Sequence, residues 1–305
     1  MMIRTSVPLA PYTNYKIGGP AQYFAEAHTT DEVREAVRAA REYNTELLVL
    51  AGGTNLLVPD EGIDKFVLHM EISGVTVHAA TATAAAGATM HELVELTIAH
   101  GLQGLEWAGG LPGSVGGAVR GNAGAFGGEM KDSLVRATVI TPDGELKEYT
   151  NKDCQFGYRE SAFKHNHDVI VEATFDLKPG NRAELTAIAE SHRAFRRERH
   201  PMEYGNAGST FKNVPVNHVP APFLQNWAHK VKTDPFPVLP AAVIIAACNL
   251  KGLRVGDAQV SEKHANYVVN LSHASAADVR AVIQDVKHRV YEQTGVTLEE
   301  EILIL

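Results

Sequence analysis

The feature that most constrains this chain is a stretch crowded with glycine between residues 109 and 128. Residues 109–118 read GGLPGSVGGA, and residues 121–128 read GNAGAFGG. Glycine adopts positive φ angles readily and lets backbone N–H groups approach a ligand closely. Consecutive N–H groups of this kind form an anion-binding concavity that suits a diphosphate, and the small side chains leave room for a flat ring system. A tight packing corner or a flexible loop is the alternative, because short glycine motifs also occur without a ligand.

The spacing of these glycines departs from two common nucleotide-binding motifs. It is not a G-x-G-x-x-G after a strand, and it is not a G-x-x-x-x-G-K-[ST] loop. Neither a Rossmann site nor a P-loop is therefore predicted.

A second glycine turn follows a short apolar run. Residues 47–50 read LLVL, which is typical of a buried strand, and residues 51–55 read AGGTN. The backbone amides, the threonine hydroxyl and the asparagine amide of this turn suit a second phosphate or a ribityl chain. An ordinary tight connection after a strand accounts for the same residues equally well.

Capping signals and hydrophobic periodicity predict helices and strands along the whole chain. Helices are expected after Thr29 and Thr89, over residues 183–200, and from Ser275 to a stop at Gly295. Strands are expected at residues 47–50, 66–72, 75–84, 135–141, 145–149 and 168–177. The prolines of residues 215–240 predict an irregular excursion, with a domain boundary between residues 200 and 240.

Composition narrows the classes of function. A chain of 305 residues is expected to form two domains, and two cysteines are too few for a disulfide framework. The net charge of −8 argues against nucleic acid and anionic lipid as partners. Neither a membrane span nor a secretory h-region is apparent, so we expect a cytoplasmic protein. The fourteen histidines lack the spacing of a metal site, and no metal is predicted.

Several ordered motifs resemble one enzyme family. They occupy residues 15–21, 51–57, 104–128, 156–164, 206–213, 250–252, 263–266 and 298–302. In these motifs the chain resembles the UDP-N-acetylenolpyruvoylglucosamine reductases (UDP-N-acetylmuramate dehydrogenases), flavoenzymes of peptidoglycan precursor synthesis. The resemblance covers nearly the whole chain.

The resemblance implies an α+β fold with two parts. An FAD-binding domain of the vanillyl-alcohol-oxidase (PCMH) type is expected over residues 1–200, in subdomains of about 1–75 and 76–200. A smaller α+β substrate-binding domain is expected over residues 201–298, and residues 299–305 are expected to return to the active site. The implied cofactor is non-covalent FAD, with NADPH as hydride donor. The implied partner is a small molecule, a UDP-sugar enolpyruvyl ether, and a monomer is the working expectation.

The family's motifs also imply site residues. The residues expected to bind the cofactor are Gly52, Gly53, Thr54, Asn55, Leu56, Gly109, Pro112, Gly113, Ser114, Gly116, Gly117, Asn122, Ala123 and Gly124. Those expected to bind substrate are Tyr158, Lys212 and Asn213.

Three catalytic residues are implied. The reaction requires a cation for the substrate carboxylate, a proton donor, and a group that stabilises the charged intermediate. Arg159 suits the first role, because a guanidinium binds a carboxylate through two parallel hydrogen bonds. Ser209 matches the family's proton donor. Glu301 matches the family's catalytic acid, and it is chosen within the run 299–301 because it directly precedes the apolar Ile302.

Other interpretations remain open. An FAD-dependent oxidase of the same fold, or a nucleotide-sugar-binding protein without catalysis, would not require all three catalytic residues. Residues 217–239 look longer than the usual link in the family and are expected to form a lid, an interface or an idiosyncratic loop. The arginines of residues 193–199 are interpreted as a solvated helix face rather than a phosphate site.

Overall fold

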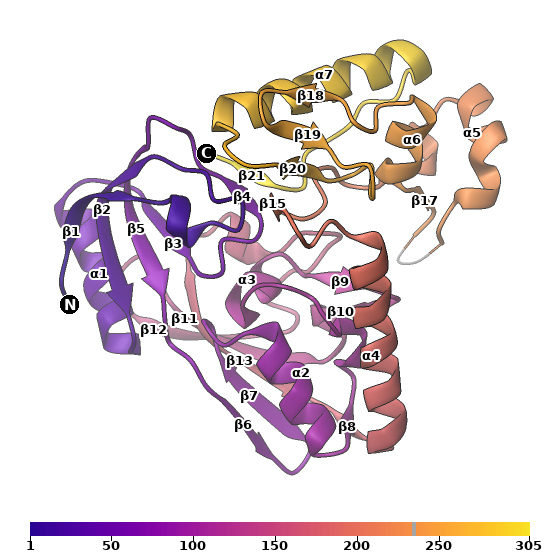
Figure 1. Ribbon diagram of the computed structural model, residues 1–305. Coiled ribbons are helices and arrows are strands. Elements are labelled where there is room, and N and C mark those ends of the chain that lie inside the picture. The colour runs from indigo at the N-terminus through magenta and orange to yellow at the C-terminus, as the bar shows by residue number, and fades with distance from the viewer. Residues whose placement is uncertain (234–235) are drawn as a thin grey trace. The chain divides into compact units, whose positions relative to one another are not determined.

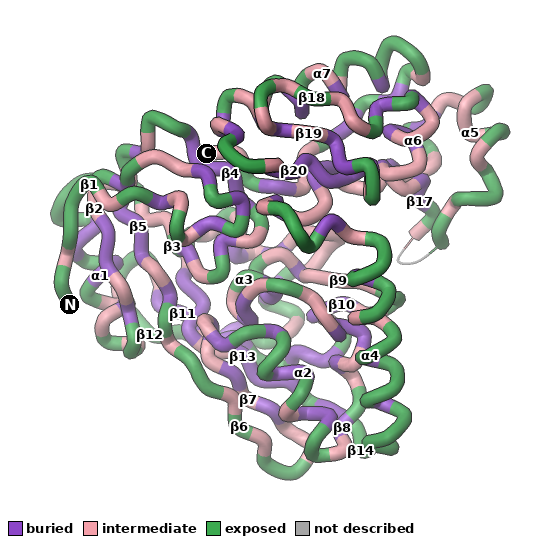
Figure 2. The backbone as a smooth tube through the Cα atoms, viewed as in Figure 1, coloured by how far each residue is buried: buried purple, intermediate pink, exposed green. Residues whose placement is uncertain are grey.

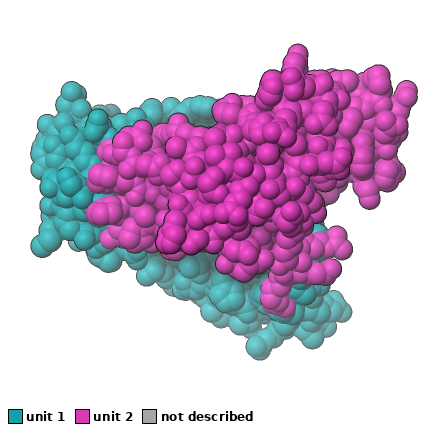
Figure 3. Space-filling model, turned by 45° about the horizontal axis from the view of Figure 1, so that its top comes forward, with its two compact units in different colours: residues 1–7, 21–52, 64–196 teal, residues 8–20, 53–63, 197–305 magenta. Residues whose placement is uncertain are grey.

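The computed structural model describes residues 1–233 and 236–305, which fold as two compact units. Unit 1 contains residues 1–7, 21–52 and 64–196, and unit 2 contains residues 8–20, 53–63 and 197–305 (Figures 1 and 3). Two short segments early in the chain therefore belong to unit 2, and the C-terminal third of the chain completes that unit. Pro235, one of the prolines of the predicted excursion, lies outside the described residues.

Unit 1 is built mainly on two sheets. In the first, β1 (Arg4–Pro8), β2 (Pro20–Ala27), β5 (Ile63–Met70) and β3 (Leu47–Leu50) follow one another, and β3 runs parallel to β5. The second is antiparallel, in the order β12 (Leu146–Thr150), β11 (Leu134–Ile140), β13 (Val169–Asp176), β7 (Thr81–Ala85) and β6 (Val75–His78).

Four helices complete unit 1, and a side-chain cap begins each of them. The helices are α1 (Thr30–Glu42), α2 (Met90–Ala99), α3 (Val115–Arg120) and α4 (Arg182–Arg199). Thr29 forms the predicted capping box, because its hydroxyl accepts the Glu32 N–H while the Glu32 carboxylate accepts the Thr29 N–H. One buried apolar core joins both sheets and these helices (Figure 2).

Unit 2 packs a long helix against a small sheet. The sheet has the order β15 (Gly205–Asn206), β20 (Val268–Asn270), β19 (Ala258–Val260) and β18 (Arg254–Val255). Helix α7 (Ala276–Thr294) contacts β18, β19 and β20 through the apolar face predicted from its periodicity. It begins at Ser275 and ends at Gly295, where φ is 71°. Helix α6 (Ala241–Ala247) contacts α7.

Short elements connect these parts. They are η1 (Ala10–Tyr12), β4 (Leu56–Leu57), β8 (Leu102–Gln103), η2 (Glu106–Ala108), β9 (Gly124–Ala125), β10 (Gly128–Glu129), η3 (Met130–Asp132), η4 (Ala162–Lys164), β14 (Lys178–Pro179), β16 (Val214–Pro215), η5 (Val216–His218), α5 (Ala221–Trp227), η6 (Ala228–Lys230), β17 (Val238–Leu239) and β21 (Leu303–Ile304).

Two predicted segments differ from the structure. Residues 75–84 were expected to form one strand, but they form the hairpin of β6 and β7, with Ala79 at a φ of 52° in the turn. The prediction was wrong because two alanines carry no turn signature. The excursion expected to be irregular contains α5, where Pro220 and Pro222 stand at the helix start, a position that tolerates proline. The antiparallel pair β16 and β17 brackets it.

Among the described residues, no helix combines the length and the apolar character that a membrane crossing requires.

Candidate functional site

Unit 2 brings two of the predicted catalytic residues onto adjacent backbone segments. The Glu301 N–H donates to the Thr210 carbonyl at 2.8 Å, and the Lys212 N–H donates to the Glu299 carbonyl at 2.9 Å. These bonds hold the two segments antiparallel, so Glu301 lies opposite the immediate neighbour of Ser209. Ser209 and Glu301 are both half-buried.

The C-terminal segment also contacts the predicted cofactor turn. Strand β21 runs parallel to β4, and the Leu303 N–H donates to the Asn55 carbonyl at 2.9 Å. The Asn55 side-chain amide donates to the Glu301 carbonyl at 3.3 Å. Thr54, Asn55 and Leu56 therefore belong to the same assembly as Ser209 and Glu301, although about 250 residues of chain separate the turn from Glu301.

Two buried asparagines fix the backbone around Ser209. The Asn206 Oδ1 accepts the Gly208 N–H at 2.9 Å. The Asn266 carbonyl accepts the Thr210 N–H at 2.8 Å, and the Asn266 Oδ1 accepts the Phe211 N–H at 3.0 Å. Sequence reasoning gave neither asparagine a role, although both lie in motifs that carried the family resemblance.

The glutamate run separates into three environments. Glu299 pairs with Lys212, and Glu300 pairs with Lys287 at 2.7 Å. Glu301, whose backbone bonds both Thr210 and Asn55, is the member held between the predicted catalytic and cofactor segments. The three consecutive glutamates therefore differ in their contacts, and the choice of Glu301 as the catalytic acid stays a prediction.

The predicted substrate-binding residues of unit 2 already contact protein groups. The Lys212 ammonium bonds the Glu299 carboxylate, and the Asn213 Oδ1 accepts the Ala241 N–H at 3.2 Å where α6 begins. The Glu299 side chain is 72% exposed, so this ion pair is weak in water. An anionic substrate can therefore compete for Lys212.

The glycine stretch of unit 1 is in part a packing corner. A Cβ atom on Gly109 would lie 2.5 Å from the Ala189 carbonyl oxygen, and one on Gly116 would lie 2.8 Å from the Ala86 Cβ. The Ser114 hydroxyl accepts the Gly117 N–H at 3.3 Å and caps α3. Close packing thus explains Gly109 and Gly116 without a ligand.

Other residues of the two glycine turns have positive φ angles or are exposed. Gly53 and Gly113 have φ angles of 58° and 102°, which glycine adopts most readily. Gly52, Asn55, Pro112 and Gly117 are exposed, although the Gly117 N–H and the Asn55 amide already bond the Ser114 hydroxyl and the Glu301 carbonyl. A Cβ atom on Gly208, next to Ser209, would meet no atom nearer than the Thr54 carbonyl oxygen at 4.0 Å. A side chain on Gly208 would therefore meet no close neighbour at its Cβ.

Arg159 lies in a tight turn of unit 1. Gly157 and Glu160 exchange both backbone hydrogen bonds, at 3.0 and 3.2 Å, which leaves Tyr158 and Arg159 at the tip. The φ angle of Arg159 is 57°, an uncommon conformation for a residue other than glycine. Its guanidinium lies 5.3 Å from the centre of the Tyr158 ring, and Nη2 donates to the Gly124 carbonyl at 2.9 Å. Arg159, Tyr158 and Gly124 are therefore in contact.

The acidic neighbour of Arg159 is held in its ionised form. Burial alone would raise the pKa of the Glu160 carboxyl, but the Ser161 N–H, Lys164 and His165 together lower that pKa below its ordinary value. Glu160 therefore carries its charge near neutral pH and is a poor proton donor.

Two of the four arginines at the end of α4, Arg193 and Arg196, correct the expectation of a solvated face. The Arg193 side chain is 18% exposed and pairs with Glu95 and Glu190. Arg196 is buried and lies 5.5 Å from the centre of the Phe126 ring. Arg197 and Arg199 are exposed, as the expectation had it. The sequence missed this because Gly110 lets the chain approach Arg193 and Arg196 closely.

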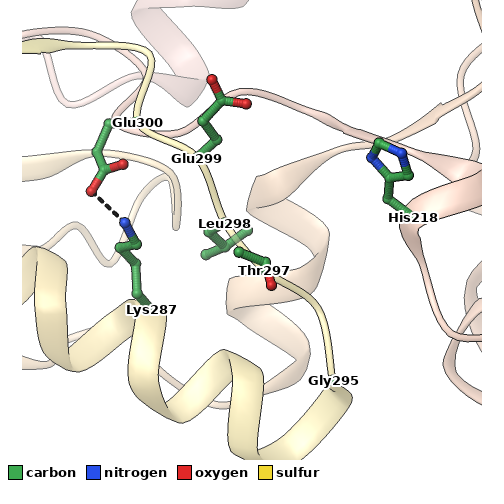
Figure 4. A pocket seen from close by; sticks show the side chains of 7 residues that line it. All are labelled: His218, Lys287, Gly295, Thr297, Leu298, Glu299 and Glu300. Atoms are coloured by element: carbon green, nitrogen blue, oxygen red, sulfur yellow. Dashed lines mark hydrogen bonds and ion pairs between the residues drawn. The ribbon is translucent and has the colours of Figure 1, made fainter.

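A cavity of about 500 Å³ lies in unit 2 but does not coincide with the candidate site. It is lined by His218, Lys287, Gly295, Thr297, Leu298, Glu299 and Glu300 (Figure 4). The ion pair of Lys287 and Glu300 closes one side. The cavity lining contains none of the predicted catalytic residues, so it borders the Glu301 segment without including it.

Comparisons with known proteins show which family the chain resembles over its whole length. Residues 21–150 match the family profile described as FAD binding domain, and residues 200–305 match that described as UDP-N-acetylenolpyruvoylglucosamine reductase, C-terminal domain. The UDP-N-acetylenolpyruvoylglucosamine reductase of Levilactobacillus brevis is 37% identical over 98% of this chain and 91% of its own length. That of Streptococcus mutans is 38% identical over 99% of this chain and 92% of its own length. The crystal structure of the reductase from Thermus caldophilus is 30% identical, with a TM-score of 0.79 over 99% of each chain.

Proposed function

The chain belongs to the UDP-N-acetylenolpyruvoylglucosamine reductase family, and from this premise we propose that it reduces UDP-N-acetylglucosamine enolpyruvate to UDP-N-acetylmuramate. FAD is the bound cofactor in this proposal, held without a covalent bond, and NADPH is the electron donor. The observation that carries the proposal is the contact of the Glu301 backbone with both the Ser209 segment and the Asn55 turn.

Different residues of the chain have different roles in the proposed reaction. When bound, FAD would accept a hydride from NADPH and deliver it to the enolpyruvyl carbon farther from the carboxylate. Arg159 binds and polarises the substrate carboxylate through its two parallel N–H groups. The Ser209 hydroxyl donates a proton to the other carbon, and Glu301 stabilises the charged intermediate. A free serine hydroxyl is a weak acid, so Ser209 requires activation by neighbours such as Lys212.

The remaining assignments complete the proposal. The turn of residues 52–56 and the segment of residues 109–124 hold FAD, while Tyr158, Lys212 and Asn213 contact substrate. Residues 1–200, 201–298 and 299–305 are proposed as the FAD-binding domain, the substrate-binding domain and the returning C-terminal segment. The product is a peptidoglycan precursor, so we place the enzyme in the cytoplasm and connect it to cell wall synthesis, cell shape and cell division.

The decisive experiment follows flavin absorbance in a stopped-flow instrument. We expect purified protein to carry flavin, NADPH to bleach it, and the enolpyruvyl substrate to restore it without oxygen. Bleaching by a sugar or alcohol, followed by restoration by oxygen, would instead identify an oxidase of the same fold. No bleaching by NADPH would leave only a nucleotide-sugar-binding protein.

Ser209→Ala tests the proton donor. Because Ser209 is proposed to act after hydride transfer to the flavin, we expect flavin reduction by NADPH to stay within about twofold of wild type, and reoxidation by substrate to fall about a hundredfold or more. Ser191→Ala is the control, since the Ser191 hydroxyl only bonds the Ile188 carbonyl on α4. Equal loss in both half-reactions would remove the proposed role.

A further inference from the structure

The side chain of Asn122, expected from the family resemblance to bind the cofactor, is enclosed within unit 1. Asn122 is 0% exposed. Its Nδ2 donates to the Gly157 carbonyl at 2.8 Å and to the Glu129 carboxylate at 3.1 Å, and its Oδ1 accepts the Lys131 N–H at 3.1 Å. A side-chain amide has two N–H donors, and both are used here. The side chain of Asn122 therefore acts through the protein groups that it bonds.

Asn122 holds the base of the turn that presents Arg159. The Gly157 carbonyl has two lone pairs; one accepts the Glu160 N–H, which closes the turn, and the other accepts Asn122 Nδ2. Loss of the amide would leave a buried carbonyl short of one donor and free the base of the turn to shift.

The same stretch of chain holds the guanidinium. Gly124 lies two residues beyond Asn122, and its carbonyl accepts Arg159 Nη2 at 2.9 Å. Gly124 pairs with Glu129 across β9 and β10, and Glu129 also accepts from Asn122. A Cβ atom on Gly124 would lie 2.7 Å from the Glu129 Cγ and 3.4 Å from Arg159 Nη1. The segment thus fixes both ends of one functional element, the turn backbone and the arginine head.

Backbone strain marks both partners. The φ angles of Asn122 and Arg159 are 41° and 57°, both in the left-handed region. Such conformations are uncommon in residues other than glycine and persist where their surroundings over-determine them, often at functional sites. The geometry points to Asn122 as a positioning residue for Arg159: its buried amide sets the place of the guanidinium that binds the substrate carboxylate. This inference rests on the proposed function of Arg159.

Equilibrium binding gives the first test. Asn122→Gly removes the amide, and glycine adopts a positive φ angle readily, so this variant should fold. Asn122→Ser is a second variant that also lacks the amide. Titration calorimetry of the oxidised holoenzyme compares the enolpyruvyl substrate with UDP-N-acetylglucosamine, which lacks the carboxylate. We expect the Kd of the first to rise roughly tenfold and that of the second to stay within about twofold. An equal rise for both ligands would overturn the inference.

A double-mutant cycle gives the second test. If Asn122 acts through Arg159, Asn122→Gly should slow flavin reoxidation by substrate roughly tenfold in the wild type, but by less than about twofold in an Arg159→Ala background. Full loss in both backgrounds would overturn the positioning role. Asn151→Ala is the matched control, because its amide likewise donates to two carbonyls of unit 1, those of Lys131 and Leu134, but holds no part of the turn.

The two hypotheses fail differently. If the wild-type flavin is neither bleached by NADPH nor restored by the enolpyruvyl substrate, the proposed function fails. If the wild type performs both steps while Asn122→Gly matches Asn151→Ala in both tests, only the positioning role of Asn122 fails.

Discussion

Single residues carry unusual conformations where the proposed chemistry requires them. Arg159 has a left-handed backbone at the tip of a four-residue turn, where glycine would be the unstrained choice. Its carbonyl accepts the Lys164 ammonium, and its guanidinium contacts Tyr158 and Gly124. Side-chain chemistry rather than backbone stability therefore explains an arginine at this position.

Replacement of Arg159 should separate stability from activity. Arg159→Gly relieves the φ angle but loses the guanidinium contacts, so the free energy of unfolding should stay within about 1 kcal/mol of wild type. In Arg159→Gly the rate of flavin reoxidation by substrate should fall at least a hundredfold. In Arg159→Lys this rate should lie between those of Arg159→Gly and wild type, because lysine keeps the charge but lacks the planar guanidinium. Urea unfolding and single-turnover absorbance provide the two measurements. Wild-type turnover of Arg159→Gly would contradict the assignment.

The three consecutive glutamates provide a built-in control. Glu301→Gln should lower kcat roughly a hundredfold, because only Glu301 is placed between the Ser209 and Asn55 segments. Glu299→Gln and Glu300→Gln remove pairs with Lys212 and Lys287 and should change kcat by less than about threefold. Steady-state rates at saturating substrate measure kcat for the three variants. A larger loss in Glu299→Gln or Glu300→Gln would shift the register of the catalytic acid.

At the scale of elements, two short strands join distant parts of the sequence. β4 and β21 have two residues each, too few to be stable alone. Their pairing depends on the turn that precedes β4, where the Gly53 carbonyl accepts the Asn14 N–H at 2.9 Å. The Glu301 segment is thus placed by a turn far away in the sequence.

Gly53→Ala should test this dependence. A Cβ atom there would lie 2.2 Å from the Tyr12 carbonyl oxygen, and φ is 58°, so a loss on the order of 2 kcal/mol in the free energy of unfolding is expected. Flavin content should fall as well. Gly74→Ala is the control for the backbone conformation, because Gly74 has a φ of 113° but no atom within 4 Å of the added Cβ. Similar stability of the two variants would show that the close approach to Tyr12 is unimportant.

At the scale of the whole molecule, one half-buried histidine, His264, ties the stability of unit 2 to pH. Burial, followed by the nearby Lys251 and Lys232, lowers the pKa of His264 to about 4, and the backbone hydrogen bond at its ring only partly opposes this. The ring packs edge-on against His200 and Tyr267. The native chain therefore keeps His264 neutral where the unfolded chain would protonate it.

This difference sets the direction of the pH dependence. The stabilisation is complete above the ordinary histidine pKa of about 6.5 and is lost as pH falls toward 4, by up to about 1.4 kcal/mol per pH unit. Urea unfolding at several pH values measures it, and the slope between pH 6.5 and 4 should be shallower in His264→Gln. An identical slope in the variant would assign the pH dependence to other groups.

Local signals predicted the longer helices and several strands of unit 1. Thr29 with Glu32 and Ser275 with Asp278 predicted two helix starts, because a capping box involves only residues within one turn. The hairpin of residues 75–84 escaped prediction, because its alanine turn takes a positive φ without a turn residue. The family resemblance named candidate residues, but it could not say which neighbours hold them.

By itself the sequence determined the family, the class of cofactor and the elements whose signals are local. The tertiary structure alone decided that residues 8–20 and 53–63 join the C-terminal unit, that the amide of Asn122 is spent on the Gly157 carbonyl, and that Glu301 bonds both Thr210 and Asn55. The reason is physical: hydrogen bonds between residues far apart in the chain depend on how separate elements pack, and no periodicity or motif spacing encodes them.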